Sequence, residues 1–325
     1  MELELVSYRR LGRTGLNIST LSMGSGGYNR LGQTSNPPLA ESEMIRLVHK
    51  VFELGINLFD TSPGYLESES ILGRAFRSMP RDRYVISTRV VFSSFDENNQ
   101  LVYSTPDEIT ESIETSLVRL GLDEIDVSLI AASERADFDR MISEQIPVLD
   151  RLRQQGKIRF LGSSETAATD GDHSWLSAVL PTESIDVIMI AHSMLNQSAR
   201  KTIFPYCNEH EIGVMNIYSV RNIFKNPERL SETIASLQEK ELLNETVDTR
   251  APFDFLLEDP NVETLVEAAY RYVVYTAGVS TAVCSAVKLE KIMENINSIA
   301  KGPLLKVQIE KLSRVFGHLS EPVGN

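Results

Sequence analysis

The sequence predicts a closed parallel (β/α)8 barrel, and two observations carry that prediction. Apolar strand-like runs alternate with helix-like runs eight times along 325 residues, which by the usual right-handed connections places the strands side by side in one parallel sheet. No Gly-x-Gly-x-x-Gly turn follows a strand, as a doubly wound dinucleotide-binding sheet would require. An open doubly wound sheet is the alternative at this point.

The first elements are a hairpin and a strand. Apolar and polar residues alternate over 8–20 around Gly12 and Gly15, which predicts a short hairpin ahead of the barrel. The run 21–27 predicts the first barrel strand. The polar, turn-rich segment 28–38 predicts a loop at the carboxyl end of that strand, where a loop is either functional or simply flexible.

Helices and strands then follow in turn. Thr105 supplies a capping hydroxyl, Pro106 occupies the first helical position and Gly121 ends the same helix. The segment 219–260 breaks the rhythm, which predicts an insertion or lid, and 304–316 predicts a closing helix. The other helices are predicted at 41–54, 67–76, 139–155, 173–180, 199–210, 262–276 and 288–299, and the other strands at 56–59, 84–88, 125–132, 158–162, 185–191, 213–218 and 279–283.

The composition favours an ordinary globular chain that forms one domain over residues 1–325. Hydrophobic residues make up 42% and charged residues 24%, and the net charge of -13 is spread along the chain, which argues against nucleic acid as a partner. No apolar run is long enough to span a membrane. Because the start lacks a signal-peptide pattern and Cys207 and Cys284 have no metal-like spacing, we expect a cytoplasmic protein with two reduced, packed thiols.

The stretch 56–65 is the first candidate site. It reads Ile-Asn-Leu-Phe-Asp-Thr-Ser-Pro-Gly-Tyr, so an apolar strand ends in the Asp60 carboxylate and a turn then presents the Tyr65 phenol. A parallel barrel builds its active site from such strand ends. The plainer interpretation is a strand-to-loop turn in which Asp60 bonds the local backbone.

Several segments together resemble the aldo-keto reductase family, from about Tyr8 to about Ile299. Leu-Gly-Arg-Thr-Gly-Leu at 11–16 and the run from Gly55 to Tyr65 match its signatures. The remaining matches are Ser-Glu-Ser-Ile-Leu-Gly at 68–73, Gly-Lys-Ile-Arg-Phe-Leu-Gly-Ser-Ser at 156–164 and Ile-Tyr-Ser at 217–219. Each is weak alone, and their order makes the resemblance specific.

The resemblance implies an NADPH-dependent carbonyl reductase in which a tyrosine gives a proton to the substrate oxygen as hydride arrives. An Asp, a Tyr, a Lys and a His do this work in the family. Asp60 and Tyr65 fall on the first two, whereas Arg89 falls where the Lys would be and Ala131 where the His would be. Arg89 supplies charge but no transferable proton, so Arg89 and Asp60 form either a tuning pair for Tyr65 or an ion pair without a catalytic task.

The resemblance also implies a cofactor site. Both anchors of the nicotinamide amide are altered, because Glu165 stands in place of an Asn and Met189 in place of a Gln. Lys288, beside the phosphate segment, supplies positive charge or is a solvated surface lysine. The candidate NADP contacts are Ser164, Tyr218, Ser219, Arg221, Ser285, Lys291, Glu294 and Asn295.

Glu165 and His192 follow neighbouring predicted strands, so we expect both at the barrel mouth with Tyr65, as a replacement acid/base set. A neutral His192 bonded to backbone is the plainer interpretation. Three functions therefore stay open. They are an oxidoreductase that moves hydride between NADP(H) and a small carbonyl or hydroxy compound, a lyase or dehydratase using Tyr65 with Glu165 or His192, and a catalytically silent ligand-binding barrel. The sequence leaves the substrate and the oligomeric state open.

Overall fold

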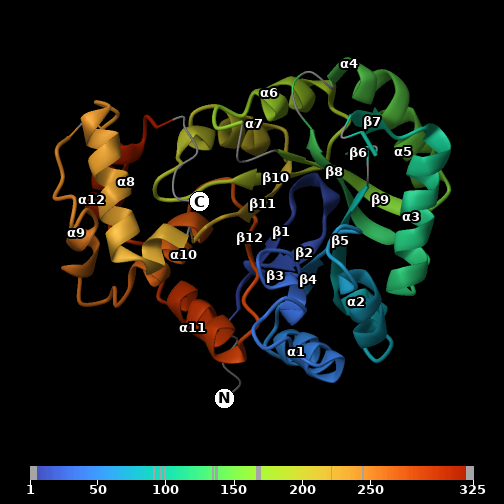
Figure 1. Cartoon of the computed structure of the whole chain (residues 1–325), viewed down its shortest axis with the longest axis horizontal. Coiled ribbons are helices and arrows are strands. Elements are labelled where there is room, and N and C mark those ends of the chain that lie inside the picture. The colour runs from blue at the N-terminus through green and yellow to red at the C-terminus, as the bar shows by residue number, and fades with distance from the viewer. Residues whose placement is uncertain are drawn as a thin grey trace.

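The computed structural model describes residues 6–90, 92–95, 97–98, 100–133, 135, 138–165, 170–220, 222–243 and 245–319. Eight parallel strands close into a ring in the order β10, β11, β12, β3, β4, β5, β8, β9 (Figure 1). The predicted barrel is confirmed, and the open sheet is excluded. The ring strands are β3 Leu21–Gly24, β4 Leu58–Asp60, β5 Val85–Val90, β8 Ile125–Ser133, β9 Ile158–Glu165, β10 Val187–Ala191, β11 Gly213–Ile217 and β12 Thr281–Cys284.

Helices surround the ring, as Figure 1 shows. The helices that follow the first five ring strands are α1 Glu41–Glu53, α2 Ser68–Phe76, α3 Pro106–Leu120, α4 Phe138–Arg140, α5 Ile146–Gln154 and α6 Ser174–Val179. Both α4 and α5 follow β8. The later ones are α7 Ile203–Glu209, α8 Pro227–Glu239, α9 Asp254–Leu257, α10 Leu265–Val274, α11 Leu289–Ala300 and α12 Lys306–Phe316. In Figure 1, α8, α9 and α12 gather at one side of the barrel, and the predicted insertion 219–260 contains α8 and α9.

Two helices show how local sequence sets the elements. In α3 the Thr105 hydroxyl accepts a hydrogen bond from Glu108 N, and the Glu108 carboxylate accepts one from Thr105 N. Gly121 ends the helix in the left-handed conformation, as predicted. The single helix predicted at 139–155 is instead divided between α4, a π-helical turn Met141–Gln145 and α5. Pro147 lies in the first turn of α5 and has no N–H for a bond to the preceding turn, which explains the division.

The N-terminal hairpin closes one end of the ring. Strands β1 Tyr8–Arg10 and β2 Asn17–Ser19 pair antiparallel, as predicted. Leu11 and Ile18 are fully buried among inward-facing barrel side chains, and a Cβ placed on Gly213, the first residue of β11, would lie 2.6 Å from Leu11 Cδ1. Contact with the start of β11 places the hairpin at the amino ends of the strands, so the opposite end is left for a site.

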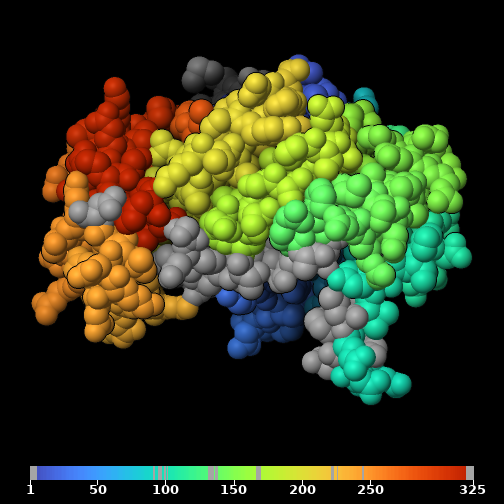
Figure 2. Space-filling view, turned by 90° about the horizontal axis from the view of Figure 1, so that it is seen from above, coloured from blue at the N-terminus to red at the C-terminus, as the bar shows by residue number. Residues whose placement is uncertain are grey.

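A second hairpin lies between β5 and α3. Strands β6 Ser93–Phe95 and β7 Leu101–Tyr103 pair antiparallel outside the ring. Figure 2 shows this turquoise segment projecting from the body on the same face as the orange segment that contains α8. Strand-forming Val102 and Tyr103 explain why this loop is ordered as a ribbon.

Three further observations bear on the sequence predictions. Among the described residues, no helix has both the length and the apolar composition needed to cross a bilayer. The same part of the chain contains no cluster of three or more potential metal ligands. Cys207 and Cys284 are unbridged and buried, and burial raises the pKa of the Cys207 thiol to about 12, which fits a packing role.

Candidate functional site

Asp60 is the last residue of β4 and points into the ring. Leu58, two residues earlier on the strand, belongs to the inward-facing cluster, and strand alternation puts Asp60 on the same side. Neighbouring strands fix its backbone, because the Asp60 carbonyl accepts from Ser25 N at 2.8 Å and the adjoining Thr61 N donates to Ser87 O at 2.8 Å. The Asp60 side chain is only 4% exposed, so its charge needs a partner.

Arg89 on β5 supplies that partner. Its Nη1 and Nη2 atoms each lie 3.3 Å from Asp60 Oδ2, and Nη1 also donates to the Thr61 carbonyl at 2.5 Å. Across the ring, Nη2 lies 3.0 Å from Met189 Sδ. Burial works to lower the pKa of Arg89, but the charges of Asp60 and Tyr65 outweigh it and raise that pKa. Arg89 therefore stays a fixed cation inside the carboxyl end of the barrel.

Tyr65 completes the predicted group. A turn brings it back over the barrel, with Tyr65 N bonding to Ser62 O at 3.0 Å. The Arg89 guanidinium lies 5.1 Å from the phenol ring centre, and a Cβ on Gly26 would lie 2.7 Å from ring atom Cε2. The carboxylate, the guanidinium and the phenol expected from the sequence thus meet at one end of the barrel.

The protonation of Tyr65 follows from these neighbours. Burial raises the pKa of the phenol, and the Asp60 charge adds to that rise. The cations Arg89 and Arg30 oppose it. Because the net shift is upward from about 10, Tyr65 carries its proton at neutral pH.

Arg30 is a site residue that the sequence analysis did not identify. Its guanidinium lies 4.6 Å from the Tyr65 ring centre, closer than that of Arg89. It comes from the loop 28–38, whose polar composition was the only available signal. No pattern in the sequence indicates which side chain of that loop contacts Tyr65.

Tyr218 lies beside the same group, directly after β11. Its phenol is close enough to act to raise the pKa of both Tyr65 and Arg89. The residue is 47% exposed. Its φ of 59° is left-handed, which is unusual for an aromatic residue. Buried Asn216 braces this bend by donating to Ile217 O at 3.1 Å and to Ser219 Oγ at 2.9 Å. An exposed aromatic face is thus held at the mouth, and the predicted contact Ser219 is bonded within the bend.

Glu165 does not join the mouth, contrary to the expectation from sequence. Its Oε2 lies 2.6 Å from His173 Nδ1, and its Oε1 accepts from Ala191 N at 2.8 Å. Burial raises the pKa of Glu165, and the hydrogen bond from His173 opposes that rise. The other nitrogen of His173 contacts Ser198 Oγ at 2.9 Å, so both carboxylate oxygens and both ring nitrogens are engaged away from Tyr65.

His192 is also turned away. Its ring packs 5.1 Å from Phe204 on α7 and 5.4 Å from Tyr272 on α10, and its Nε2 lies 3.3 Å from Thr276 Oγ1. Burial and the nearby charge of Arg200 lower the pKa of His192 to about 3, so the imidazole is neutral. The expected place at the mouth is wrong. The plainer interpretation fits, because the neutral imidazole has a hydrogen bond with the backbone of Asn196 in addition to its contact with Thr276.

Strand alternation explains both corrections. Met189 on β10 faces the ring interior, so Ala191 faces inward and the next residue, His192, faces the helices. On β9 the Trp175 indole of α6 donates to Ser163 Oγ at 2.8 Å, which puts Ser163 and Glu165 on the helix side. Ser164, between them, is buried and directed toward the interior, where the resemblance placed a cofactor contact.

The proposed phosphate and adenine contacts lie after β12. Ser285 packs against the glycines of the first loop, since a Cβ on Gly24 would lie 2.9 Å from its Oγ. Lys291 and Glu294 form an exposed ion pair at 2.7 Å on α11. Asn295 faces inward instead, is 7% exposed and donates to Cys284 Sγ at 3.4 Å. Arg221 lies outside the described residues, and Ala131 lies in β8.

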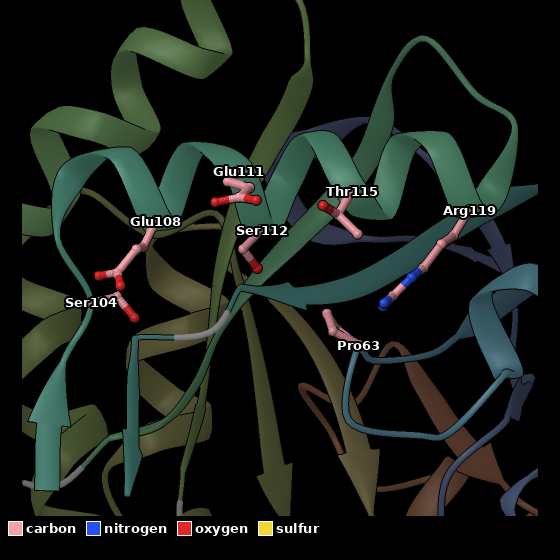
Figure 3. Close-up of a pocket in the computed structure, with 7 residues that line it drawn as sticks. All are labelled: Pro63, Ser104, Glu108, Glu111, Ser112, Thr115 and Arg119. Atoms are coloured by element: carbon pink, nitrogen blue, oxygen red, sulfur yellow. The ribbon is translucent and has the colours of Figure 1, made fainter. Parts of the chain in front are cut away.

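A separate hollow of about 260 Å³ lies on the outer surface along α3. Figure 3 shows Glu108, Glu111 and Arg119 on that helix, with Pro63 facing them from the loop before Tyr65. The hollow is lined by Pro63, Ser104, Glu108, Glu111, Ser112, Thr115 and Arg119. Neither Asp60 nor Tyr65 lines it, so it is distinct from the barrel mouth.

Comparison with known proteins decides the family. The model of the aldo/keto reductase family matches residues 22–315. The chain belongs to this family. Its structure superposes on an aldo-keto reductase from Bacillus halodurans in the holo form with a TM-score of 0.71, over 94% of this chain and 96% of the other, at 24% sequence identity.

Curated relatives of this aldo/keto reductase match over part of their length. L-galactose dehydrogenase from Arabidopsis thaliana is 32% identical over 216 residues, covering 65% of this chain and 64% of the relative. NADH-specific methylglyoxal reductase from Escherichia coli is 30% identical over 220 residues, covering 64% of this chain and 65% of the relative. A putative voltage-gated potassium channel subunit beta from Schizosaccharomyces pombe is 32% identical over 173 residues, covering 52% of this chain and 48% of the relative. The chain thus spans just under two thirds of the first two relatives, which are oxidoreductases by name.

Proposed function

We propose that this aldo/keto reductase moves hydride between NADP(H) and a small carbonyl or hydroxy compound, with Tyr65 as the acid/base. The observation that carries the proposal is the phenol of Tyr65 held 5.1 Å from the Arg89 guanidinium, which is itself paired with Asp60 at the carboxyl ends of the strands. A positioned proton donor at this end of a barrel suits carbonyl reduction. Family membership supplies the nicotinamide chemistry.

The mouth offers surfaces that fit a nicotinamide dinucleotide. Tyr218 presents an exposed aromatic face beside Tyr65, on which a flat ring can stack, and inward-facing Ser164 is a polar group for its amide. Ser219 and Ser285 supply hydroxyls for the phosphates. Lys288 occupies the N-cap position of α11 and adds positive charge near a helix N-terminus, as does Lys291, whose ammonium is paired with Glu294. The bound dinucleotide would supply the hydride.

Proton transfer falls to Tyr65. In the reduction direction its hydroxyl gives a proton to the carbonyl oxygen while the carbonyl carbon accepts hydride, so an alcohol forms and a phenolate is left. Arg89 stabilises that phenolate by its charge, yet it cannot return the proton, because a guanidinium does not ionise at ordinary pH. Solvent must therefore reprotonate Tyr65, and its raised pKa makes the acid form the resting state.

The geometry disfavours the lyase hypothesis. That mechanism needed Glu165 or His192 beside Tyr65, whereas Glu165 is bonded to His173 and His192 is packed against Phe204. The silent barrel remains the competing function, since one relative is named as a channel subunit. We favour the redox function over it because Tyr65, Asp60 and Arg89 are assembled as a unit.

The test combines binding and turnover. NADPH and NADH are titrated separately against the protein while cofactor fluorescence is followed, and carbonyl reduction is then assayed with wild type and Tyr65→Phe. We expect binding to persist in the variant and kcat to fall about 100-fold or more, because one general acid is lost. Tyr8→Phe is the matched control, since that hydroxyl bonds Gly55 O at the opposite end of the barrel. Absence of binding at millimolar cofactor would refute the proposal.

A further inference from the structure

Arg30 places a second cation at the mouth, and no ion pair neutralises its charge among the residues that the structure describes. No carboxylate of the described part of the chain lies within ion-pair distance of Arg30, whereas Arg89 is paired with Asp60 at 3.3 Å. Arg30 is only partly buried. An uncompensated guanidinium beside the acid/base is unexpected in a chain whose net charge is -13.

The loop holds Arg30 in a fixed position. The backbone is left-handed at Arg30, with φ 43°, and at Leu31, with φ 60°, a conformation that costs side-chain-bearing residues about 1 kcal/mol or more each. Leu31 compensates by burying its side chain almost completely, at 1% exposure. Such strain persists only where the surroundings determine the conformation, so the direction of Arg30 is preorganised.

Gln33 ties this loop to the loop that carries Tyr65. Its Nε2 donates to Arg30 O at 2.8 Å, to Tyr65 O at 3.2 Å and to Ser68 Oγ at 3.0 Å, and its Oε1 accepts from Glu67 N at 2.9 Å. One side chain thereby fixes the backbones of Arg30 and Tyr65 relative to each other. A substrate whose oxygen reaches Tyr65 must pass within a few ångströms of Arg30.

We infer that Arg30 binds a carboxylate on the substrate, so the preferred substrates are oxo acids and hydroxy acids whose carboxylate lies close to the reacting carbon. The inference rests on the proposed function and names its substrate class. A planar guanidinium donates two parallel hydrogen bonds to a carboxylate, and Arg89 is already occupied by Asp60. The 4.6 Å separation of Arg30 from the Tyr65 ring requires a short spacing between carboxylate and carbonyl.

The test uses substrates that differ only in charge. Pyruvate is compared with pyruvamide, and succinic semialdehyde with its amide, in wild type, Arg30→Gln and Arg30→Lys. We expect wild type to favour the carboxylates, and Arg30→Gln to lower kcat/KM for them about 10- to 100-fold more than for the amides, mainly through KM, because any effect of Arg30 on Tyr65 is common to both substrates. Arg30→Lys should retain part of the preference, because lysine keeps the positive charge but cannot donate two parallel hydrogen bonds to the carboxylate.

Equilibrium binding separates this inference from the redox proposal. Titration calorimetry of lactate and lactamide against wild type and Arg30→Gln needs no turnover. Lactate binding that Arg30→Gln abolishes, without any hydride transfer, would support the role of Arg30 and refute the redox function. Equal turnover of carboxylate and amide, equal losses of both in Arg30→Gln, or failure of wild type to bind lactate both without and with NADPH would overturn the inference and leave Arg30 as a packing partner of Tyr65. Unchanged thermal unfolding of Arg30→Gln and Arg30→Lys controls for folding.

Discussion

Replacing Arg89 with Met tests the central ion pair. The Met side chain approximates the length and apolar volume of the arginine stem, and it removes the guanidinium from Asp60 and from the Thr61 carbonyl. The Asp60 carboxylate, 4% exposed, then has no cation to offset its burial. Breaking a buried pair by removing one partner costs about 3–5 kcal/mol of unfolding free energy.

The loss of unfolding free energy in Arg89→Met should increase with pH. Burial already raises the pKa of Asp60 above its unfolded value, and Arg89 restrains that rise, so Arg89→Met raises the folded pKa further. A group with a raised folded pKa contributes stability below its unfolded pKa and loses it as pH rises through the folded pKa. The destabilisation should therefore be larger at pH 8 than at pH 5, where protonation of Asp60 relieves part of the cost.

Urea unfolding followed by circular dichroism measures the effect at both pH values. Arg10→Met is a matched control, because Arg10 and Glu211 are separated by a similar 3.4 Å but are 59% and 63% exposed, so the loss should stay below about 1 kcal/mol. The double variant Asp60→Asn with Arg89→Met should recover much of the stability. A loss in Arg89→Met no larger than in Arg10→Met, or the same at both pH values, would refute the argument.

Three further predictions follow from the protonation states. The rate of alcohol oxidation should rise with pH to beyond about 10, because the raised pKa keeps Tyr65 protonated, while reduction stays level between about pH 6 and 9; an oxidation midpoint near neutrality would contradict this. The His192 imidazole should show no NMR titration between about pH 5 and 8, since its pKa is lowered to about 3, and a midpoint near 6.5 would show that it is not buried as described. Glu165→Gln should lower the unfolding free energy by about 1.5–3 kcal/mol, because it removes a charge-assisted bond to His173, and denaturant unfolding indistinguishable from wild type would disprove that role.

Most of the architecture was predictable because it repeats local rules. The alternation of apolar runs defined the ring, and the Thr105 cap and Gly121 defined the ends of α3. Asp60 and Tyr65 were placed together because parallel strands deliver their carboxyl ends to one edge, whereas Arg89 was assigned to the site by the family resemblance. Positions set by the period of a strand or the cap of a helix can be derived from sequence alone.

The errors came from side-chain direction at strand ends. Strand β9 continues to Glu165 instead of ending at 162, and the alternation along it turns Glu165 outward and Ser164 inward. Applying the same alternation to β10 would have excluded His192 from the mouth, because inward-facing Met189 is three residues earlier. Arg30 depended on left-handed loop geometry and on Gln33, which no periodic pattern encodes.

The β1–β2 hairpin gives the barrel a sealed base. Leu11 and Ile18 fill that end of the ring, and Arg9 secures the hairpin through bonds to Val274 O and Val279 O at 2.5 and 2.9 Å. Among the described residues, the buried side chains of Leu11 and Ile18 block the amino end of the ring, so ligands reach Asp60 from the carboxyl ends of the strands. Whichever of two ligands sits deeper has to arrive first and depart last, so turnover should follow a compulsory order that product-inhibition patterns can reveal.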